Sequence, residues 1–256
     1  MTFEVKQINN PEIKNPILIE GLPGIGNVGK IAVDFIIDNI KAKKFIDIYS
    51  KAFPNSVFIN EKNLVHMPHI SLYYKKVKNQ DLIFLSGDVQ PLDERACYEF
   101  CDLIINTLKK YNGKEIITIG GIGMPKIPKN PVVYCTANEY GIIKRYKTKE
   151  LNDQIFGTVG PIIGVTGLLV GLAGKSSIPS IALLAQTFGH PNYLGIKGAN
   201  EVLKILDKKL NLDLNLNLLE KEIKDIEREI KIKSAMPIPK IKTAEMEGRD
   251  KTSYIG

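Results

Sequence analysis

The chain has 256 residues, of which 44% are hydrophobic and 25% are charged, a balance that is ordinary for a soluble globular protein. The net charge is +7, but lysines are mixed with acidic residues and no nucleic-acid-binding motif is present, so we expect no nucleic-acid partner. The N-terminus has no apolar signal core, which predicts a cytoplasmic protein.

Apolar runs bounded by breakers predict strands at about 16–20, 44–50, 56–60, 69–76, 81–86, 115–120, 131–137 and 179–187. Amphipathic stretches predict helices at about 27–41, 92–111, 161–174 and 196–210. This alternation predicts an α/β fold, a three-layer sandwich with a mostly parallel sheet. No helix separates the strands around 56 to 86, so we expect an antiparallel meander or hairpin there.

The first predicted strand runs into a glycine-rich turn. Gly24, Gly26 and Gly29 match the G-x-G-x-x-G spacing of a dinucleotide-binding turn. The second strand lacks a carboxylate at its end for the ribose, and Ile31 replaces the hydroxyl residue that a P-loop requires. A structural turn with close helix–strand approach is therefore the favoured interpretation.

Further glycine-rich turns lie at 120–123 and 157–160, and a polar segment at 86–91 follows another predicted strand. Turns at the carboxyl ends of strands line a crevice in open α/β sheets, so a ligand pocket is the alternative. The residues of this structural turn or pocket are Gly24, Gly26, Asn27, Gly29, Asp88 and Gln90.

No catalytic group, metal site or cofactor is predicted. His66 and His69 are three apart around a proline and share no helix face, and Cys97 and Cys101 lack a second ligand pair. We expect the cysteines to be small buried hydrophobes. The apolar stretch 155–174 is long enough for a membrane span, but it lacks flanking anchors, so a buried helix is preferred.

The C-terminal part divides into two segments after a domain over residues 1–211. An a/d seam predicts an amphipathic helix over 212–234, which either packs on its own domain or joins protomers of an oligomer. The tail, 235–256, is predicted to be flexible, and its apolar tip is a candidate docking peptide. The seam comprises Leu216, Leu219, Ile223, Ile226 and Ile230, and the tip is Tyr254, Ile255 and Gly256.

Four segments together resemble the archaeal branch of the proteasome assembly chaperone family, relatives of the second eukaryotic proteasome assembly chaperone. They are residues 21–30, 86–91, 119–123 and 164–168. The resemblance implies a fold related to the nucleoside phosphorylase type. It also implies a non-catalytic homo-oligomer that helps α subunits of the proteasome core particle assemble, with or without a paralogous chaperone.

Family members that dock on the α ring often end in hydrophobic–Tyr–any residue. Here Tyr254 is third from the end and follows Ser253, so the pattern is shifted by one position. Docking of the tip on an α subunit is the expected use of the tail. The alternative function is a nucleoside- or nucleotide-binding enzyme or sensor that uses the glycine-rich loops at the strand ends.

Overall fold

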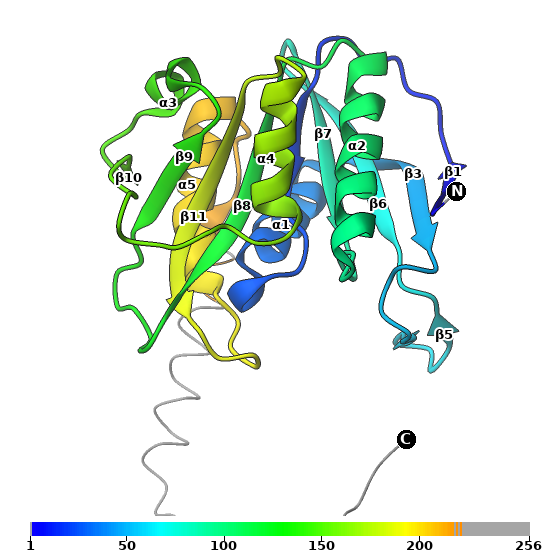
Figure 1. Ribbon diagram of the computed structural model, residues 1–256, viewed down its shortest axis with the longest axis horizontal. Helices are drawn as coiled ribbons and strands as arrows, with labels where there is room; N and C mark the ends of the chain where they lie inside the picture. The colour runs from blue at the N-terminus through cyan, green and yellow to red at the C-terminus, as the bar shows by residue number, and fades with distance from the viewer. Residues whose placement is uncertain (1, 218, 220, 222–256) are drawn as a thin grey trace, which may run out of the picture.

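The computed structural model describes residues 2–217, 219 and 221, which form a three-layer α/β sandwich (Figure 1). A nine-stranded sheet has the order β1-β3-β6-β7-β2-β8-β11-β9-β10. Its strands are β1 (Phe3–Gln7), β2 (Ile17–Glu20), β3 (Lys43–Ser50), β6 (Ile70–Val77), β7 (Gln80–Gly87), β8 (Glu115–Met124), β9 (Val133–Ala137), β10 (Leu151–Asn152) and β11 (Ser180–Phe188). A separate hairpin joins β4 (Phe58–Ile59) to β5 (Val65–His66).

Helices cover both faces of the sheet. The helical elements are η1 (Ile25–Asn27), α1 (Val28–Ile40), α2 (Glu94–Lys110), α3 (Tyr140–Tyr146), α4 (Val165–Lys175) and α5 (Ile196–Leu210). In Figure 1, α2 and α4 lie in front of the sheet, and α1 and α5 lie behind it. Each of the two helical layers packs on its own apolar core, because the central strands bury side chains on both faces of the sheet.

The sheet is mixed, which corrects the prediction of a mostly parallel sheet. The four central strands, β7, β2, β8 and β11, run parallel to one another, and β10 pairs parallel with β9 at one edge. On one side β1, β3 and β6 pair antiparallel, and on the other β9 runs antiparallel to β11. A tight turn joins β6 to β7 without a crossover helix, so these two strands must run in opposite directions. The nucleoside phosphorylase likeness stays a prediction.

Each predicted strand and helix has a counterpart in the structure, and the central elements agree within a few residues. The elements missed are short or exposed. Helix α3 has seven residues and η1 has three, β1 buries only Phe3 among its five residues, and β5 and β10 have two residues each. All three cysteines are free and buried, as predicted. Among the described residues no helix is long and apolar enough to cross a membrane, and α4 begins only at Val165.

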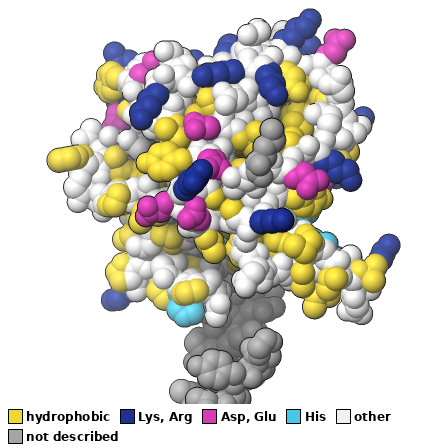
Figure 2. Space-filling model, turned by 45° about the vertical axis from the view of Figure 1, so that its right-hand side comes forward, with side chains coloured by type: hydrophobic (Ala, Val, Ile, Leu, Met, Phe, Trp, Pro, Cys, Tyr) yellow, Lys and Arg dark blue, Asp and Glu magenta, His cyan; other side chains and the backbone are white. Residues whose placement is uncertain are grey.

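The hairpin β4–β5 projects from the body of the protein and carries exposed apolar side chains. Figure 2 shows apolar side chains gathered on this projection at the lower right. Ile59 is 70% exposed and Val65 is 67% exposed. We define the hairpin patch as Val57, Phe58, Ile59, Leu64, Val65 and Met67.

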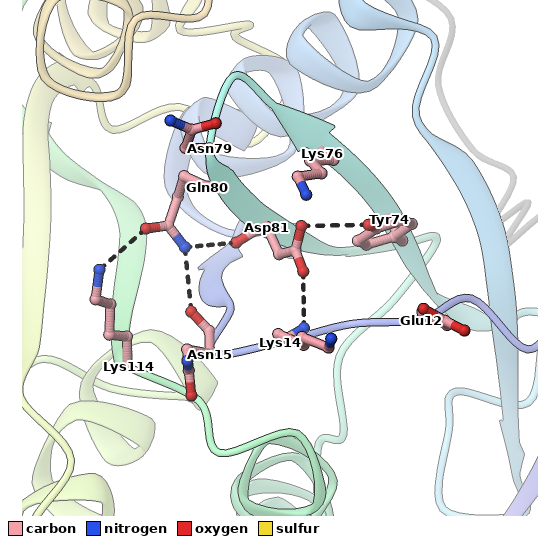
Figure 3. A pocket seen from close by; sticks show the side chains of 9 residues that line it. All are labelled: Glu12, Lys14, Asn15, Tyr74, Lys76, Asn79, Gln80, Asp81 and Lys114. Carbon is pink, nitrogen blue, oxygen red and sulfur yellow. Dashed lines mark hydrogen bonds between the residues drawn. The ribbon is translucent and has the colours of Figure 1, made fainter.

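A polar pocket of about 370 Å³ lies at the amino end of β2 (Figure 3). Asp81 accepts hydrogen bonds from the Lys14 backbone N–H, at 2.7 Å, and from the Tyr74 hydroxyl, at 3.3 Å. Gln80 donates to the carbonyl of Asn15 at 3.1 Å. Because these bonds fasten the segment before β2 to β7, we assign the pocket a structural role.

Candidate functional site

The glycine turn brings the start of α1 against the sheet. A Cβ on Gly29 would lie 2.4 Å from the carbonyl oxygen of Ile119, and a Cβ on Gly21 would lie 2.2 Å from that of Gly29. Both distances are far below van der Waals contact, so neither position accommodates a side chain. The close helix–strand approach predicted from the spacing is therefore present at Gly29.

The other residues of the turn differ in what they require. Gly26 has φ +63°, and a Cβ there would lie 2.5 Å from the Thr187 hydroxyl. Its carbonyl accepts a hydrogen bond of 2.7 Å from the N–H of Gly195. Asn27 precedes α1 in the left-handed region, with φ +51°. Gly24 has open space around it and an extended backbone, so packing does not require glycine there.

A crevice of about 560 Å³ lies beside this turn, where β2 and β8 end. Its walls are the turn itself, the end of β8 around 119–123, and the loop 158–163. The described residues that line it are mostly glycine and aliphatic, and none carries a charged side chain. The predicted crevice is thus present, but a nucleotide's phosphates would meet no side-chain counter-charge in it.

Glu20 is fully buried at the end of β2, beside the turn. Burial raises its pKa to about 7, although hydrogen bonds from the Leu22 N–H and the Thr166 hydroxyl oppose this shift. Burial therefore favours the neutral form of this carboxyl group relative to a glutamate in water. Sequence reasoning missed this residue, although an acidic residue ending an apolar strand was the available signal.

Gln90 connects the glycine turn to the start of α4. Its Nε2 donates to the carbonyl of Pro23 at 2.7 Å, and its Oε1 accepts from the N–H of Val165 at 3.2 Å. Asp88 takes no part in these hydrogen bonds of Gln90 and instead contacts His66 and His69. Helix α2 is capped by Asp93, which accepts from the N–H of Ala96 at 2.8 Å.

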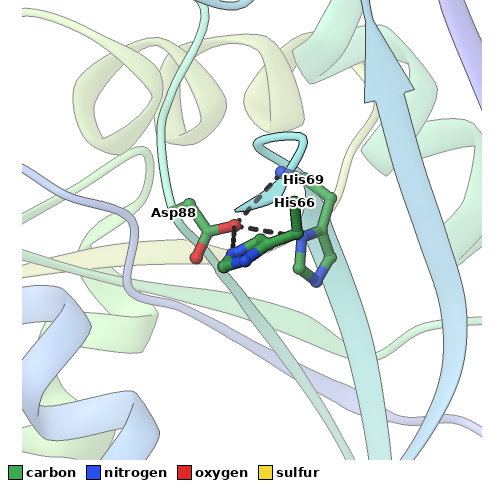
Figure 4. Close-up of side chains that lie close together, drawn as sticks. All are labelled: His66, His69 and Asp88. Carbon is green, nitrogen blue, oxygen red and sulfur yellow. Dashed lines mark hydrogen bonds and ion pairs between the residues drawn. The ribbon is translucent and has the colours of Figure 1, made fainter. Parts of the chain in front are cut away.

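Asp88, His69 and His66 form a cluster beside the hairpin (Figure 4). Asp88 Oδ2 lies 3.0 Å from His69 Nδ1 and 3.9 Å from His66 Nε2. The hydrogen bond with Asp88 raises the pKa of His69, although burial opposes the shift. Burial alone would raise the pKa of Asp88, but the hydrogen bonds from His69 outweigh it and lower that pKa.

Sequence reasoning missed the cluster because it considered only helical spacing between the histidines. The antiparallel register of β6 and β7 pairs Ile70 with Gly87 and so places His69 opposite Asp88. This register could have been inferred from the sequence, because both strands and the turn between them are predicted there.

The C-terminal candidates are described only in part. Leu219 is buried and Leu216 is partly buried, and both pack against the core beneath α1 and α5. The other predicted residues lie outside the described residues. These are Ile223, Ile226, Ile230, Tyr254, Ile255 and Gly256.

Comparisons with known proteins give consistent results. The model of the PAC2 family matches residues 18–232. Uncharacterized protein MJ0106 of Methanocaldococcus jannaschii is 34% identical over 224 residues, which are 86% of this chain and 86% of that protein.

Two solved structures from Pyrococcus furiosus are similar over nearly the whole chain. PbaB, an archaeal proteasome activator, is 31% identical with a TM-score of 0.84, and the match covers 91% of this chain and 100% of that one. PbaA, an archaeal homolog of proteasome-assembly chaperone, is 27% identical with a TM-score of 0.73, covering 90% and 91%.

Replacing Gly26 by alanine should destabilise the fold, because the new Cβ meets Thr187 and the positive φ is strained for alanine. We expect the free energy of unfolding, measured by urea denaturation, to fall by about 1–3 kcal/mol. Gly24→Ala is the matched control and should change it by less than about 0.5 kcal/mol. Equal effects of the two substitutions would contradict this account of the turn.

Glu20 should make stability depend on pH. Between its unfolded pKa of 4.5 and its folded pKa of about 7, the folded state holds a proton that the unfolded state releases. Rising pH across this window should therefore lower the free energy of unfolding, by about 3 kcal/mol in total. Glu20→Gln should remove this loss in urea denaturation series at pH 5, 6, 7 and 8.

Glutamine suits this test because its amide keeps an acceptor for Leu22 and offers a donor to Thr166. The control substitution is Glu12→Gln at an exposed position, which should leave the pH dependence as in the wild type. Parallel stability curves for wild type and Glu20→Gln would refute the proposed role of Glu20.

Proposed function

The chain belongs to the PAC2 family, and we propose that it is a non-catalytic assembly chaperone that binds α subunits of the proteasome core particle. The observation that carries this proposal is the similarity to PbaB and PbaA, both of which are described in relation to the proteasome. The similarity extends over about nine-tenths of the chain rather than over one motif.

The hairpin patch supports a binding role. Contiguous exposed apolar side chains are unusual on monomeric proteins and mark interaction sites. Here the exposed pair Ile59 and Val65 lies on a projection that the rest of the described chain leaves uncovered. A partner that covers the patch would remove this apolar surface from water, so we assign it to contact with an α subunit.

The glycine turn supports the same choice over a nucleoside- or nucleotide-binding role. Ile119 and Thr187 occupy the space where side chains at Gly29 and Gly26 would lie. Packing within the chain therefore accounts for these glycines without a ligand.

The C-terminal part supplies the second element of the proposal. We assign residues 1–211 to the chaperone domain, 212–234 to a helix that joins protomers or packs on its own domain, and 235–256 to a docking tail. Several tails on one homo-oligomer would raise the effective concentration of Tyr254 at a ring with repeated pockets. This role calls for a cytoplasmic protein that works with or without a paralogous chaperone.

Activation of the assembled proteasome is the second candidate function. It is favoured by the higher identity and TM-score of PbaB, which is described as an activator. The two functions differ in their target, because a chaperone acts on free α subunits and an activator acts on the finished particle. Reconstitution of the core particle from subunits, and peptide hydrolysis by the assembled particle, separate them.

Removal of the tail should weaken binding to proteasome α subunits. In a pull-down with purified α subunits, we expect the full chain to bind and a chain ending at Glu247 to bind at least about tenfold more weakly, equivalent to 1.4 kcal/mol. Failure of both chains to bind α subunits or assembled particles would refute the proposed function. Equal binding by both would refute only the role of the tail.

A less apolar hairpin should also weaken this binding. Ile59 and Val65 form a cross-strand pair, and replacing both by threonine keeps β-branched side chains while removing exposed apolar surface. We expect the dissociation constant for α subunits to rise at least about tenfold with unchanged thermal stability. Tyr140→Ala is the control, because Tyr140 is also exposed but lies on α3, far from the hairpin (Figure 1).

A further inference from the structure

Three segments that are separate in the fold bring potential metal ligands together at the base of the hairpin. His66 belongs to β5, His69 directly precedes β6, and Asp88 directly follows β7. One ligand atom from each side chain lies within 4.8 Å of the other two. The side chains of His69 and Asp88 are about a quarter exposed and that of His66 is 39% exposed, so an ion can reach them from solvent.

We propose that His66, His69 and Asp88 bind a divalent transition-metal ion, best matched by Zn²⁺, which fastens the hairpin to the sheet. Two imidazoles and one carboxylate are a ligand set that zinc uses, with a fourth position left for water. When zinc is bound tetrahedrally by imidazole nitrogens and carboxylate oxygens, neighbouring ligand atoms lie about 3.4 Å apart. The observed distances from Asp88 Oδ2, 3.0 Å and 3.9 Å, lie on either side of that value.

Aromatic contacts hold both imidazole rings in place. His66 stacks on Phe58 with centroids 5.7 Å apart, and His69 stacks on Tyr49 at 5.8 Å. The backbone is fixed as well, because the Asp88 N–H donates to the carbonyl of His69 at 3.0 Å. The ligands are therefore largely preorganised, and an ion would need to order little of the chain.

Nearby lysines do not occupy the positions that an ion needs. Lys44 Nζ lies 3.3 Å from His69 Nε2, the nitrogen that faces away from Asp88, and it is also 3.0 Å from Asp47. Coordination through Nδ1 would release to solvent the proton that Nδ1 shares with Asp88, so the neutral ring would keep its proton on Nε2 and Lys44 would stay with Asp47. Lys30 pairs with Asp34 at 2.7 Å, which offsets its charge beside Asp88.

Within the hairpin loop, Asn60 Oδ1 accepts hydrogen bonds from the N–H groups of Lys62 and Leu64. The hairpin contains only two residue pairs, Phe58 with His66 and Ile59 with Val65, and a two-stranded hairpin of this size is marginal by itself. Within the cluster, His66 is the residue that belongs to the hairpin. An ion that binds His66 together with His69 and Asp88 would join the hairpin to the ends of two core strands.

Zinc titration of the full chain, in competition with a chromophoric chelator, tests the site. We expect one Zn²⁺ per chain, and binding at least about tenfold weaker in His66→Ala and Asp88→Asn. His190→Ala is the matched control and should bind as the wild type. Mg²⁺ should not compete, because it prefers oxygen ligands. Wild-type binding no tighter than that of His66→Ala and Asp88→Asn would overturn the site.

A second measurement tests the fastening of the hairpin. Lys62 is exposed in the loop between β4 and β5, so trypsin cleavage there reports on local opening. Zinc should slow this cleavage several-fold in the wild type and in His190→Ala, and leave it unchanged in His66→Ala. Thermal melts without metal would confirm that each variant is folded. Wild-type cleavage that zinc leaves unchanged would refute the fastening role, whatever the titration gives.

Discussion

The approach of Gly29 to the carbonyl of Ile119 is the constraint on which the centre of this fold depends. It brings the start of α1 to the sheet at a distance that no side chain permits. Gly26, three residues earlier, lies so near Thr187 on β11 that a Cβ would not fit, and its carbonyl accepts a hydrogen bond from Gly195 before α5. One short turn therefore positions two strands and two helices, and the crevice beside it follows from the same packing.

The elements that could be predicted are those whose burial follows from the local pattern of apolar residues. Strand β2 is buried at all four positions, and α2 buries one face at helical spacing, so apolar periodicity identified both. Strand β1 could not be found in this way, because it buries only Phe3 and depends on pairing with β3. The antiparallel pairing of β6 with β7 was predicted, because no helix separates them, but the reversed direction of β9 was missed.

The candidate site shows the same division between local and non-local information. The glycine spacing correctly indicated a close approach, yet it did not distinguish Gly24, which has free space, from Gly29, which has none. The cluster of His66, His69 and Asp88 depends on strand register, so the spacing of these residues along the sequence does not predict it. The burial of Glu20 depends on contacts from α4, which is about 145 residues away in the sequence.

A buried glutamate with a pKa of about 7 beside a crevice would ordinarily suggest catalysis. Here the geometry argues otherwise, because Glu20 is fully enclosed and hydrogen bonds from Leu22 and Thr166 reach its two carboxyl oxygens. A molecule in the crevice would have to displace protein contacts before meeting this carboxyl group. The exposed apolar hairpin at the antiparallel side of the sheet has no such barrier. The parallel centre therefore supplies rigidity, and the side bearing the hairpin presents the exposed apolar surface that we assign to a protein partner.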